Sequence, residues 1–352
     1  MASTSSPAWV LTSQSSFDSL QLIDNHPTRQ LGEHDILVEL HAASLNYRDI
    51  VLAKGTIPLP FFRPGVIPGS DGAGVVEKVG ISVKGFQPGD RVCTYLAPHL
   101  PPSKPASMAD ICHGLGQELD GTLQSHGVFH ETALVHMPEG LDYLEASTLT
   151  CSGLTAWNAL FGVEGYRPKD KDYVLVQGTG GVSIAALQFA LAAGATVIAT
   201  TSTEAKAERL RALGAHHVIN YREDADWGAT AKGITENGEG VHIVVDVGGS
   251  STISQSLKAI RIGGLISLAG MLGKEEEGPS VPNMMDCLWN VCAARGFLLG
   301  TRDQFREMNQ FITKQGIKPV VDERVFEFEE AKQAYELLEK QQHFSKVCIR
   351  IR

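Results

Sequence analysis

The stretch that decides the fold reads Val174-Leu-Val-Gln-Gly178-Thr-Gly180-Gly181-Val-Ser183-Ile-Ala-Ala186. An apolar strand runs directly into closely spaced glycines, and the glycines run directly into a segment that suits a helix. In this context a G-x-G-x-x-G pattern indicates a dinucleotide-binding turn. Gly178 permits the tight turn, Gly180 leaves room for a pyrophosphate, and Ser183 is a small residue at the third glycine position. The alternative is a glycine turn with no ligand.

Predicted helices and strands alternate on both sides of this turn. Strands are predicted at residues 173–177, 196–201, 217–220, 241–247 and 264–269, and helices at 144–162, 181–193, 205–213 and 253–260. Alternation of this kind is typical of right-handed crossovers between parallel strands, with helices covering the sheet. The middle of the chain is therefore predicted to form a doubly wound α/β domain.

The two ends of the chain have a different pattern, in which short strands are separated by turns. Strands are predicted at 35–41, 71–79 and 91–95, and near the end a helix at 329–340 lies between extended segments at 320–328 and 346–351. Prolines and scattered glycines in residues 98–124 favour a long surface loop. We predict a β-rich domain from residues 1–146 and 312–352, interrupted by the α/β domain at residues 147–311.

The composition is that of an ordinary globular protein and argues against several classes. Of the 352 residues 43% are hydrophobic, and the formal net charge of −10 disfavours nucleic-acid binding. No stretch approaches the roughly 20 apolar residues that span a bilayer, and residues 1–6 lack the features of a signal peptide. The six cysteines form no C-x-x-C pair, which indicates buried or half-buried thiols. We therefore expect a cytoplasmic protein with a small-molecule substrate and no membrane partner.

The strand after the glycine turn indicates which dinucleotide is bound. An NAD site usually has an acidic residue about 20 residues after the first glycine, but this strand ends Ala199-Thr200-Thr201-Ser202 without a carboxylate. Glu204 follows, and the spacing Thr201-x-x-Glu204 predicts a helix capping box that explains the acid without a ligand. A hydroxyl and Lys206 in place of the acid suit a 2′-phosphate, which favours NADP(H). The alternative for Lys206 is a solvated helix face.

These residues resemble the medium-chain dehydrogenase/reductase superfamily over nearly the whole chain, because several landmarks occur in the family's order. Besides the glycine turn they are Leu45-Asn-Tyr-Arg-Asp49, Pro68-Gly-Ser-Asp-Gly-Ala-Gly74, Gly89-Asp-Arg-Val92, Leu213-Gly-Ala215, Asp246-Val-Gly-Gly249 and His343-Phe-Ser-Lys-Val347. The resemblance implies a GroES-like β-rich catalytic domain, built from both chain ends around a Rossmann domain, with the active site in the cleft between them. The chain resembles most the zinc-independent quinone oxidoreductase and enoyl reductase-like branch.

The resemblance also implies a set of cofactor contacts. In quinone reductase-like relatives the positions of Ser202, Lys206 and Tyr221 surround the 2′-phosphate, which supports NADP(H). The residues expected to bind the cofactor are Gly178, Thr179, Gly180, Gly181, Val182, Ser202, Lys206, Tyr221, Gly248 and Gly270. Relatives are often dimers joined through the edge of the Rossmann sheet, for which residues 295–300 are the candidate strand, so a homodimer is expected.

Zinc-dependent alcohol dehydrogenases of this family take their metal ligands from three landmarks, of which this chain matches one. Asn46 stands where the first cysteine would be, Gly69-Ser70-Asp71 stands where the family reads Gly-His-Glu, and only Cys151 matches. One thiolate does not hold a catalytic Zn²⁺, which needs three protein ligands. His126 and His130 lie on a predicted strand, where positions four apart are separated by about 13 Å. No metal is therefore expected.

Without a metal, the expected reaction is one that hydride transfer drives with little Lewis-acid assistance. Reduction of a quinone, or of the activated C=C bond of an enone or enoyl thioester, meets this condition. The negative charge then spreads onto an oxygen that one hydrogen-bond donor stabilises. The loop Ser44-Leu-Asn-Tyr-Arg-Asp49 also resembles the matching loop in the enoyl reductase domains of fatty acid and polyketide synthases. Asn46 and Tyr47 are the candidates for substrate polarisation or proton donation.

Alternatives stay open for both the residues and the reaction. Enoyl reductase domains often carry Phe where Tyr47 stands, so the alternative for Tyr47 is a residue that only lines the pocket. We expect Asp49 to fix its loop as a hydrogen-bond acceptor and Cys151 to be a packing residue. The alternative functions are a metal-free NADP-dependent alcohol or aldehyde oxidoreductase and a non-catalytic NADPH-binding protein.

Overall fold

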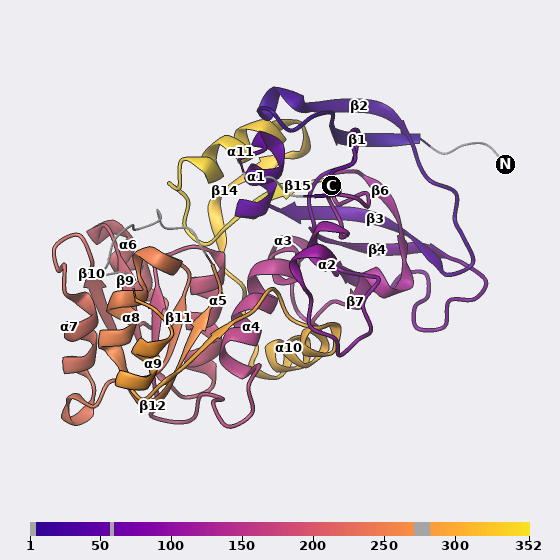
Figure 1. Ribbon diagram of the computed structural model, residues 1–352. Coiled ribbons are helices and arrows are strands. Elements are labelled where there is room, and N and C mark those ends of the chain that lie inside the picture. Colours follow the sequence, from indigo (N-terminus) through magenta and orange to yellow (C-terminus); the bar gives the residue numbers. More distant parts are fainter. Residues whose placement is uncertain (1–4, 57–59, 271–281) are drawn as a thin grey trace. The chain divides into compact units, whose positions relative to one another are not determined.

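The glycine turn joins strand β8 (Tyr173–Gln177) to helix α5 (Gly181–Ala192), in the order that the sequence predicts. The computed structural model describes residues 5–56, 60–270 and 282–352. Residues 1–4, which belong to the segment 1–6 where we expect no signal peptide, lie outside the described residues. The chain divides into two units (Figure 1). Unit 1 comprises Met1–Leu154 and Thr301–Arg352, and unit 2 comprises Thr155–Gly300.

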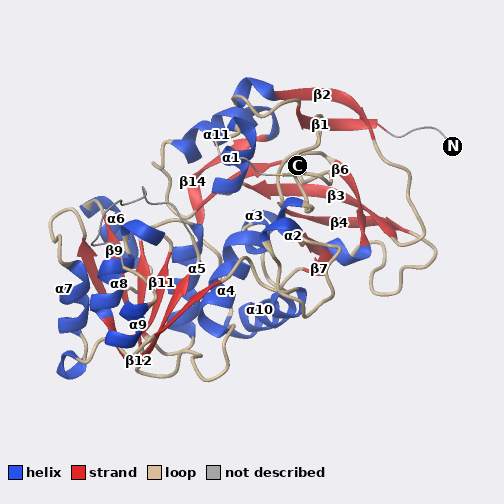
Figure 2. Ribbon diagram, viewed as in Figure 1, coloured by secondary structure: helices blue, strands red, loops and turns tan. Residues whose placement is uncertain are grey.

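Unit 2 is a parallel sheet with helices on both of its faces (Figure 2). The strand order is β10-β9-β8-β11-β12-β13, and the order reverses next to β8, which is the doubly wound topology. The strands are β9 (Thr196–Thr201), β10 (His217–Asn220), β11 (Val241–Asp246), β12 (Ile260–Leu268) and β13 (Ala293–Gly296). The helices are α6 (Glu204–Ala212), α7 (Trp227–Ile234), α8 (Ile253–Ala259) and α9 (Met285–Trp289).

The core of unit 2 forms because its strands are apolar on both faces, as parallel sheets covered by helices require. One buried cluster joins four adjacent strands to helices α7 and α8 through Leu175, Ile198, Val244, Ile266, Trp227, Ala231 and Leu257. Burial of this kind is worth about 1.5–3 kcal/mol for each large apolar side chain. The cluster holds β8 rigidly, and β8 in turn fixes the position of the glycine turn.

Unit 1 is built on a sheet whose strands come from both ends of the chain. The order is β14-β15-β3-β4-β5-β7, with β6 paired to β3 beside this path and a separate pair β1-β2. Every pair is antiparallel except β14 with β15. The strands are β1 (Ser5–Leu11), β2 (Leu20–Pro27), β3 (Asp35–Ser44), β4 (Asp71–Val79), β5 (Arg91–Thr94), β6 (His126–His130), β7 (Leu134–His136), β14 (Val321–Glu327) and β15 (Lys346–Arg350).

The pairing of β15 with β3 brings the C-terminus against the N-terminal half of unit 1 (Figure 1). Cys348 lies opposite Ser44, and Ser44 lies opposite Asp71 on β4. A buried cluster that includes Leu52, Phe326 and Tyr335 joins α1 (Tyr47–Lys54) to β14 and α11 (Ala331–Glu339). The parallel sheet and the β-rich part together confirm the predicted α/β fold class.

The predicted helix at 144–162 is three shorter segments. Helix α3 (Tyr143–Ser147) is followed by a π-helical turn at Leu149–Gly153 and then by α4 (Leu154–Phe161). A π-helical turn adds one residue per turn to a helix and is often found at functional sites. The predicted strand at 295–300 is also displaced, because β13 occupies Ala293–Gly296.

The prediction of a surface loop at 98–124 is wrong for its second half. The segment contains α2 (Met108–Cys112), and Cys112, Gln117 and Leu123 are completely buried. Arg48 explains this burial, because its guanidinium donates to the carbonyl oxygens of Ile111 and Leu115, at 3.2 and 3.1 Å.

The segment from α10 (Arg302–Gln315) to the C-terminus belongs with unit 1. Arg302 donates to the carbonyl oxygens of Thr132 and Leu100, and Asn309 donates to that of His136. Residues 147–154 and 301–311, which we assigned to the Rossmann domain, therefore pack within unit 1.

All six cysteines are free thiols; Cys93, Cys112 and Cys348 are buried and the others half-buried. Among the described residues, no helix is both long and apolar enough to cross a membrane.

Candidate active site

The glycine turn has the backbone geometry of a phosphate cradle. Gly178 has φ +74°, a left-handed conformation that glycine adopts without strain. Gly180 is the N-cap of α5 with φ −77° and ψ 173°, and α5 begins at Gly181 without a side-chain cap. The backbone N–H groups in the first turn of a helix have no intrahelical acceptor and carry the positive end of the helix dipole. The turn can therefore hold an anionic group.

The space beside Gly180 distinguishes a ligand site from a merely tight turn. A Cβ placed on Gly180 would meet no heavy atom of the described residues within 4 Å. The φ of Gly180 is also negative, so neither its conformation nor packing against the described residues requires glycine there. Gly248 and Gly270 differ, because a Cβ would lie 2.5 Å from Thr252 Cγ2 or 2.7 Å from the Val247 oxygen. The residues of the turn fit the pyrophosphate of a dinucleotide.

A buried hydrogen-bond network joins the end of β8, where the turn begins, to the segment that follows β11. Ser183 donates its hydroxyl to the Gln177 carbonyl oxygen at 2.6 Å, which anchors α5 to β8. Gln177 Nε2 donates to Asp246 Oδ2 at 3.2 Å, and Asp246 Oδ1 accepts the N–H of Gly249 and the hydroxyl of Thr252. Sequence reasoning gave no role to Gln177 or to the Asp246 side chain.

Two of the predicted 2′-phosphate residues, Ser202 and Tyr221, follow the paired strands β9 and β10. Tyr221 N–H donates to the Thr201 carbonyl oxygen at 3.0 Å, which places Tyr221 beside the residue that precedes Ser202. The Thr201 hydroxyl is buried and has no hydrogen-bond partner among the described residues.

The predicted capping box at Thr201 and Glu204 is wrong. Thr203 is the N-cap of α6 and accepts the N–H of Lys206 at 3.4 Å. Glu204 instead points to solvent and pairs with Arg211 at 2.5 Å. Glu204 therefore lies in the first turn of α6, beyond the end of β9, and forms an ion pair along the helix instead of a cap.

In unit 1, the end of β3 and the start of α1 position Asn46 and Tyr47. Asn46 is the N-cap of α1, and its backbone N–H donates to Asp49 Oδ2 at 2.7 Å. Burial raises the pKa of the Asp49 carboxyl to about 6, against the lowering effect of the Arg48 charge. The prediction that Asp49 fixes this loop as an acceptor is confirmed.

Lys346, the first residue of β15, is the centre of a buried polar cluster with Asn46 and Asp71. Its ammonium donates to the Leu45 carbonyl oxygen at 2.7 Å and to Asn46 Oδ1 at 2.6 Å. It also lies 3.5 Å from Asp71 Oδ2, and the two side chains are 4% and 0% exposed. The cluster forms because β15, β3 and β4 are neighbours in the sheet. The sequence comparison included Lys346 in a landmark without giving it a role.

The π-helical turn supplies the remaining contacts of this cluster. Cys151 donates its backbone N–H to Asp71 Oδ2 at 3.1 Å, and Ser152 Oγ lies 3.4 Å from Asn46 Oδ1. Burial raises the pKa of the Cys151 thiol to about 12, with a further contribution from the Asp71 charge. A thiol with that pKa is protonated and unreactive at neutral pH.

Asn46 Nδ2 and the Tyr47 hydroxyl have no hydrogen-bond partner among the described residues, and they lie in different surroundings. Asn46 Nδ2 is buried and has no hydrogen-bond partner among the described residues. The side chain of Tyr47 is 45% exposed, and no described residue hydrogen-bonds to its hydroxyl. The structure therefore includes Asn46 in the cluster and leaves the Tyr47 hydroxyl outside it.

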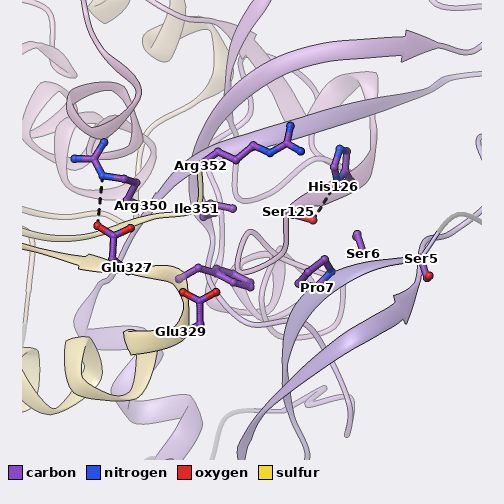
Figure 3. Close-up of a pocket in the computed structure, with 11 residues that line it drawn as sticks. Ser5, Ser6, Pro7, Ser125, His126, Glu327, Glu329, Arg350, Ile351 and Arg352 are labelled. Atoms are coloured by element: carbon purple, nitrogen blue, oxygen red, sulfur yellow. Dashed lines mark hydrogen bonds and ion pairs between the residues drawn. The ribbon is translucent and has the colours of Figure 1, made fainter.

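No group of three or more His, Cys, Asp or Glu side chains suited to a metal ion occurs in the described part of the chain. His126 and His130 are at the two ends of β6, as their spacing predicts. A pocket of about 340 Å³ on unit 1 is lined by the start of β1, by Ser125 and His126 and by Arg350 to Arg352 (Figure 3). None of the predicted site residues lines it.

Comparison with known proteins agrees with both units. Residues 32–139 match the family described as alcohol dehydrogenase GroES-like domain, and residues 181–314 match the family described as zinc-binding dehydrogenase. A zinc-type alcohol dehydrogenase-like protein of Schizosaccharomyces pombe is 43% identical over 339 residues, which cover 96% of each chain. A 2-haloacrylate reductase of a Burkholderia species is 33% identical over 68% of this chain and 66% of its own.

The fold itself is shared with solved structures. An NAD-dependent alcohol dehydrogenase of known crystal structure has 31% sequence identity to this chain and a TM-score of 0.84. The match covers 98% of this chain and 100% of the dehydrogenase chain. The GroES-like and dehydrogenase matches occur in the order that the landmarks predict. With its dinucleotide turn, its doubly wound sheet and these relatives, the chain belongs to the medium-chain dehydrogenase/reductase superfamily and is an oxidoreductase of that family.

Proposed function

We propose that this protein is a zinc-independent, NADPH-dependent reductase of the activated C=C bond of an enone or enoyl thioester, or of a quinone. The observation that carries the proposal is Asn46, whose Oδ1 accepts from Lys346 while its buried Nδ2 has no acceptor among the described residues. A buried donor without a partner costs about 1–3 kcal/mol, so its presence calls for an explanation. A substrate oxygen that gains negative charge would satisfy it.

The side chains at the family's metal position support a reaction without zinc. Asn46 and Ser70 replace two of the three ligands, so that Cys151 alone matches the family's metal position. The Lys346 ammonium lies 2.6 Å from Asn46 Oδ1 and 3.5 Å from Asp71 Oδ2, so a cation already pairs with this cluster. A divalent ion there would face a neighbouring positive charge, and these residues do not fit it.

The remaining residues suit conjugate reduction. When bound, the reduced nicotinamide supplies a hydride to the β-carbon of the substrate. The C=C electron pair then moves toward the carbonyl group, whose oxygen becomes an enolate oxygen. Asn46 Nδ2–H donates to that oxygen and stabilises the developing charge. Tyr47 delivers a proton to the α-carbon and regains one from solvent, which leaves the saturated product and the oxidised cofactor.

Two further points support this substrate class. The 33% identical relative acts, by its name, on a haloacrylate, an alkene activated by a carboxyl group. Oxidation of a plain alcohol needs a metal or a base to remove the hydroxyl proton. The two carboxylates near Asn46 are already engaged as acceptors, because Asp71 pairs with Lys346 and Asp49 accepts the Asn46 N–H. We therefore assign neither of them as that base.

We propose NADPH rather than NADH because of the strand tip after the turn. Neither Thr201 nor Ser202 carries the charge that would repel a 2′-phosphate, and Glu204 is paired with Arg211. The buried Thr201 hydroxyl without a partner, together with Ser202, Lys206 and Tyr221, offers donors to that phosphate.

The test is to measure NADPH and NADH oxidation by the purified protein with an enone, a quinone and an aldehyde. We expect oxidation of NADPH with the enone or the quinone, at a higher kcat/KM than with NADH. Oxidation with the aldehyde alone would support the alcohol/aldehyde oxidoreductase. Tight NADPH binding without turnover of any of the three would indicate a non-catalytic binder, and both results would overturn the proposal.

We also propose that the protein is a homodimer joined through the edge of the unit 2 sheet. β13 is the last strand of that sheet, and only β12 pairs with it among the described strands. Among the described residues of unit 2, several large apolar side chains near β13 in the sequence are exposed, namely Ile262, Met284, Met285, Leu288, Trp289 (75% exposed) and Val291. A second copy would pair the open edge and cover these side chains. Analytical ultracentrifugation should give twice the chain mass, and Trp289→Asp should weaken the association; a wild-type monomer would exclude the dimer.

A further inference from the structure

The ammonium of Lys346 has three N–H donors and faces three acceptors. They are the Leu45 carbonyl oxygen, Asn46 Oδ1 and Asp71 Oδ2, at 2.7, 2.6 and 3.5 Å. An ammonium group has no acceptor atom, so the side-chain atom of Asn46 that faces it must be the amide oxygen. Its side chain is 4% exposed, and its donors are already engaged within the chain.

We propose that Lys346 is the positioning residue that keeps Asn46 as a hydrogen-bond donor to the substrate. This inference rests on the proposed function, because it assigns a role within the same site. Asn46 carries an amide whose oxygen and nitrogen exchange places when the group rotates by half a turn. Lys346 selects the rotamer with Oδ1 toward the ammonium, and that rotamer turns Nδ2 away from it. Lys346 therefore acts through Asn46 and does not touch the substrate.

Neighbouring groups make the selection one-sided. Ser152 Oγ, 3.4 Å from Asn46 Oδ1, adds a second donor on the same side. The Asn46 backbone N–H donates to Asp49 Oδ2 at 2.7 Å, which fixes the backbone of Asn46 at the start of α1. After a flip, Nδ2 would face the ammonium, with donor against donor in a buried site. Asp71, which also accepts the Cys151 N–H, holds the ammonium in place.

Steady-state kinetics with a good enone substrate is the first test. Removal of a single donor to a developing oxyanion typically lowers kcat by about 10²–10³-fold. We expect Asn46→Ala to lower kcat in that range with little change in the KM for NADPH, and Lys346→Met to lower it by at least about tenfold. Lys346→Arg, which keeps a cation with donors only, should restore most of kcat.

A double-mutant cycle tests whether Lys346 acts through Asn46. If it does, Lys346→Met added to Asn46→Ala should lower kcat no further, because the group that it positions is already absent. Lowering by the full product of the two single effects would show that Lys346 acts independently and would overturn the inference. Lys84→Met, an exposed lysine of the same unit, is the control and should leave kcat unchanged.

Loss of Lys346 leaves Asp71 buried without its partner, which could unfold unit 1. The double variant Lys346→Met with Asp71→Asn removes both charges and keeps the test usable. It should bind NADPH as the wild type does and still have low kcat. Wild-type kcat in this folded variant would contradict the inference.

A second readout does not depend on turnover. In ¹⁵N-asparagine-labelled protein without cofactor, the Asn46 side-chain amide, identified by its loss in Asn46→Ser, should give one distinct, slowly exchanging pair of signals. In the Lys346→Met/Asp71→Asn variant these signals should broaden or move to ordinary solvent-exposed values. An unchanged Asn46 amide would refute the positioning role even if wild-type protein reduces enones. If the amide signals change in the variant but the wild-type protein reduces no activated alkene, the contact between Lys346 and Asn46 stands and only the proposed function is refuted.

Discussion

Gly180→Ala separates cofactor binding from folding more cleanly than any other substitution in the glycine turn. The added Cβ meets no heavy atom of the described residues within 4 Å, and φ −77° with ψ 173° is open to any L-residue. Replacing glycine by alanine reduces the freedom of the unfolded chain, worth about 0.4–1 kcal/mol, but alanine is a poorer helix N-cap than glycine by a similar amount. The unfolding free energy measured in urea should therefore change by less than about 1 kcal/mol.

The same methyl group occupies the space where the pyrophosphate would lie against the backbone. We expect the Kd for NADPH, measured by the quenching of protein fluorescence, to rise at least about tenfold, which corresponds to about 1.4 kcal/mol. Gly233→Ala is the matched control, since Gly233 lies in α7 with nothing within 4 Å of a Cβ. It should stabilise α7 by up to about 1 kcal/mol and leave the Kd unchanged. Unchanged NADPH binding in Gly180→Ala would refute the assignment of this turn to the phosphates.

Three further predictions follow from the same contacts. Because burial raises the folded-state pKa of Asp49 to about 6 from 3.8, protonation of this carboxyl favours the fold, and its contribution is lost as pH rises through about 6. The unfolding free energy of the wild type should therefore fall between pH 5 and pH 7 by roughly 1 kcal/mol more than that of Asp49→Asn, and equal pH dependences in urea titrations would contradict this pKa. Lys206→Ala should weaken NADPH binding about tenfold or more and leave NADH binding unchanged, as titration with each cofactor would show. Tyr47→Phe should lower kcat at least about tenfold at unchanged NADPH affinity, and an unaffected kcat would remove Tyr47 from the mechanism.

The parts of the fold that the sequence predicted best are those with a strong periodic pattern. The strand before Gly178 and the helix after it occur where the apolar spacing and the glycines place them. His126 and His130 lie on a strand, as the apolar segment 127–135 predicts, although the structure divides that segment into β6 and β7. These elements are set by local propensity and by which face is buried, and both are visible in a single stretch of sequence.

The errors came from contacts between residues far apart in the chain. Leu115 and Gln117 are buried against Arg48, which lies more than sixty positions away, and a run rich in proline and glycine carries no sign of this contact. The cap of α6 was misplaced because Thr201, Ser202 and Thr203 are all suitable cap residues.

The candidate site was predicted in part for the same reason. Asn46 and Tyr47 were chosen as candidates because their loop is a continuous motif, and of the two the structure includes Asn46 in the polar cluster. Lys346 was assigned no role, since its contact with Asn46 joins positions 300 residues apart and requires the pairing of β15 with β3. Asp71 likewise carried no signal beyond a departure from the family's metal ligands.

The most direct test of the central claim is the destination of the transferred hydride. NADPH deuterated at C4 of the nicotinamide, on each face in turn, is incubated with an α,β-unsaturated ketone and protein purified in the presence of a chelator, and zinc is measured in the same sample. We predict a saturated ketone with deuterium on its β-carbon, formed by protein that holds far less than one zinc per chain. Deuterium on the carbonyl carbon of an alcohol product, or activity that appears only when zinc is restored, would contradict the account.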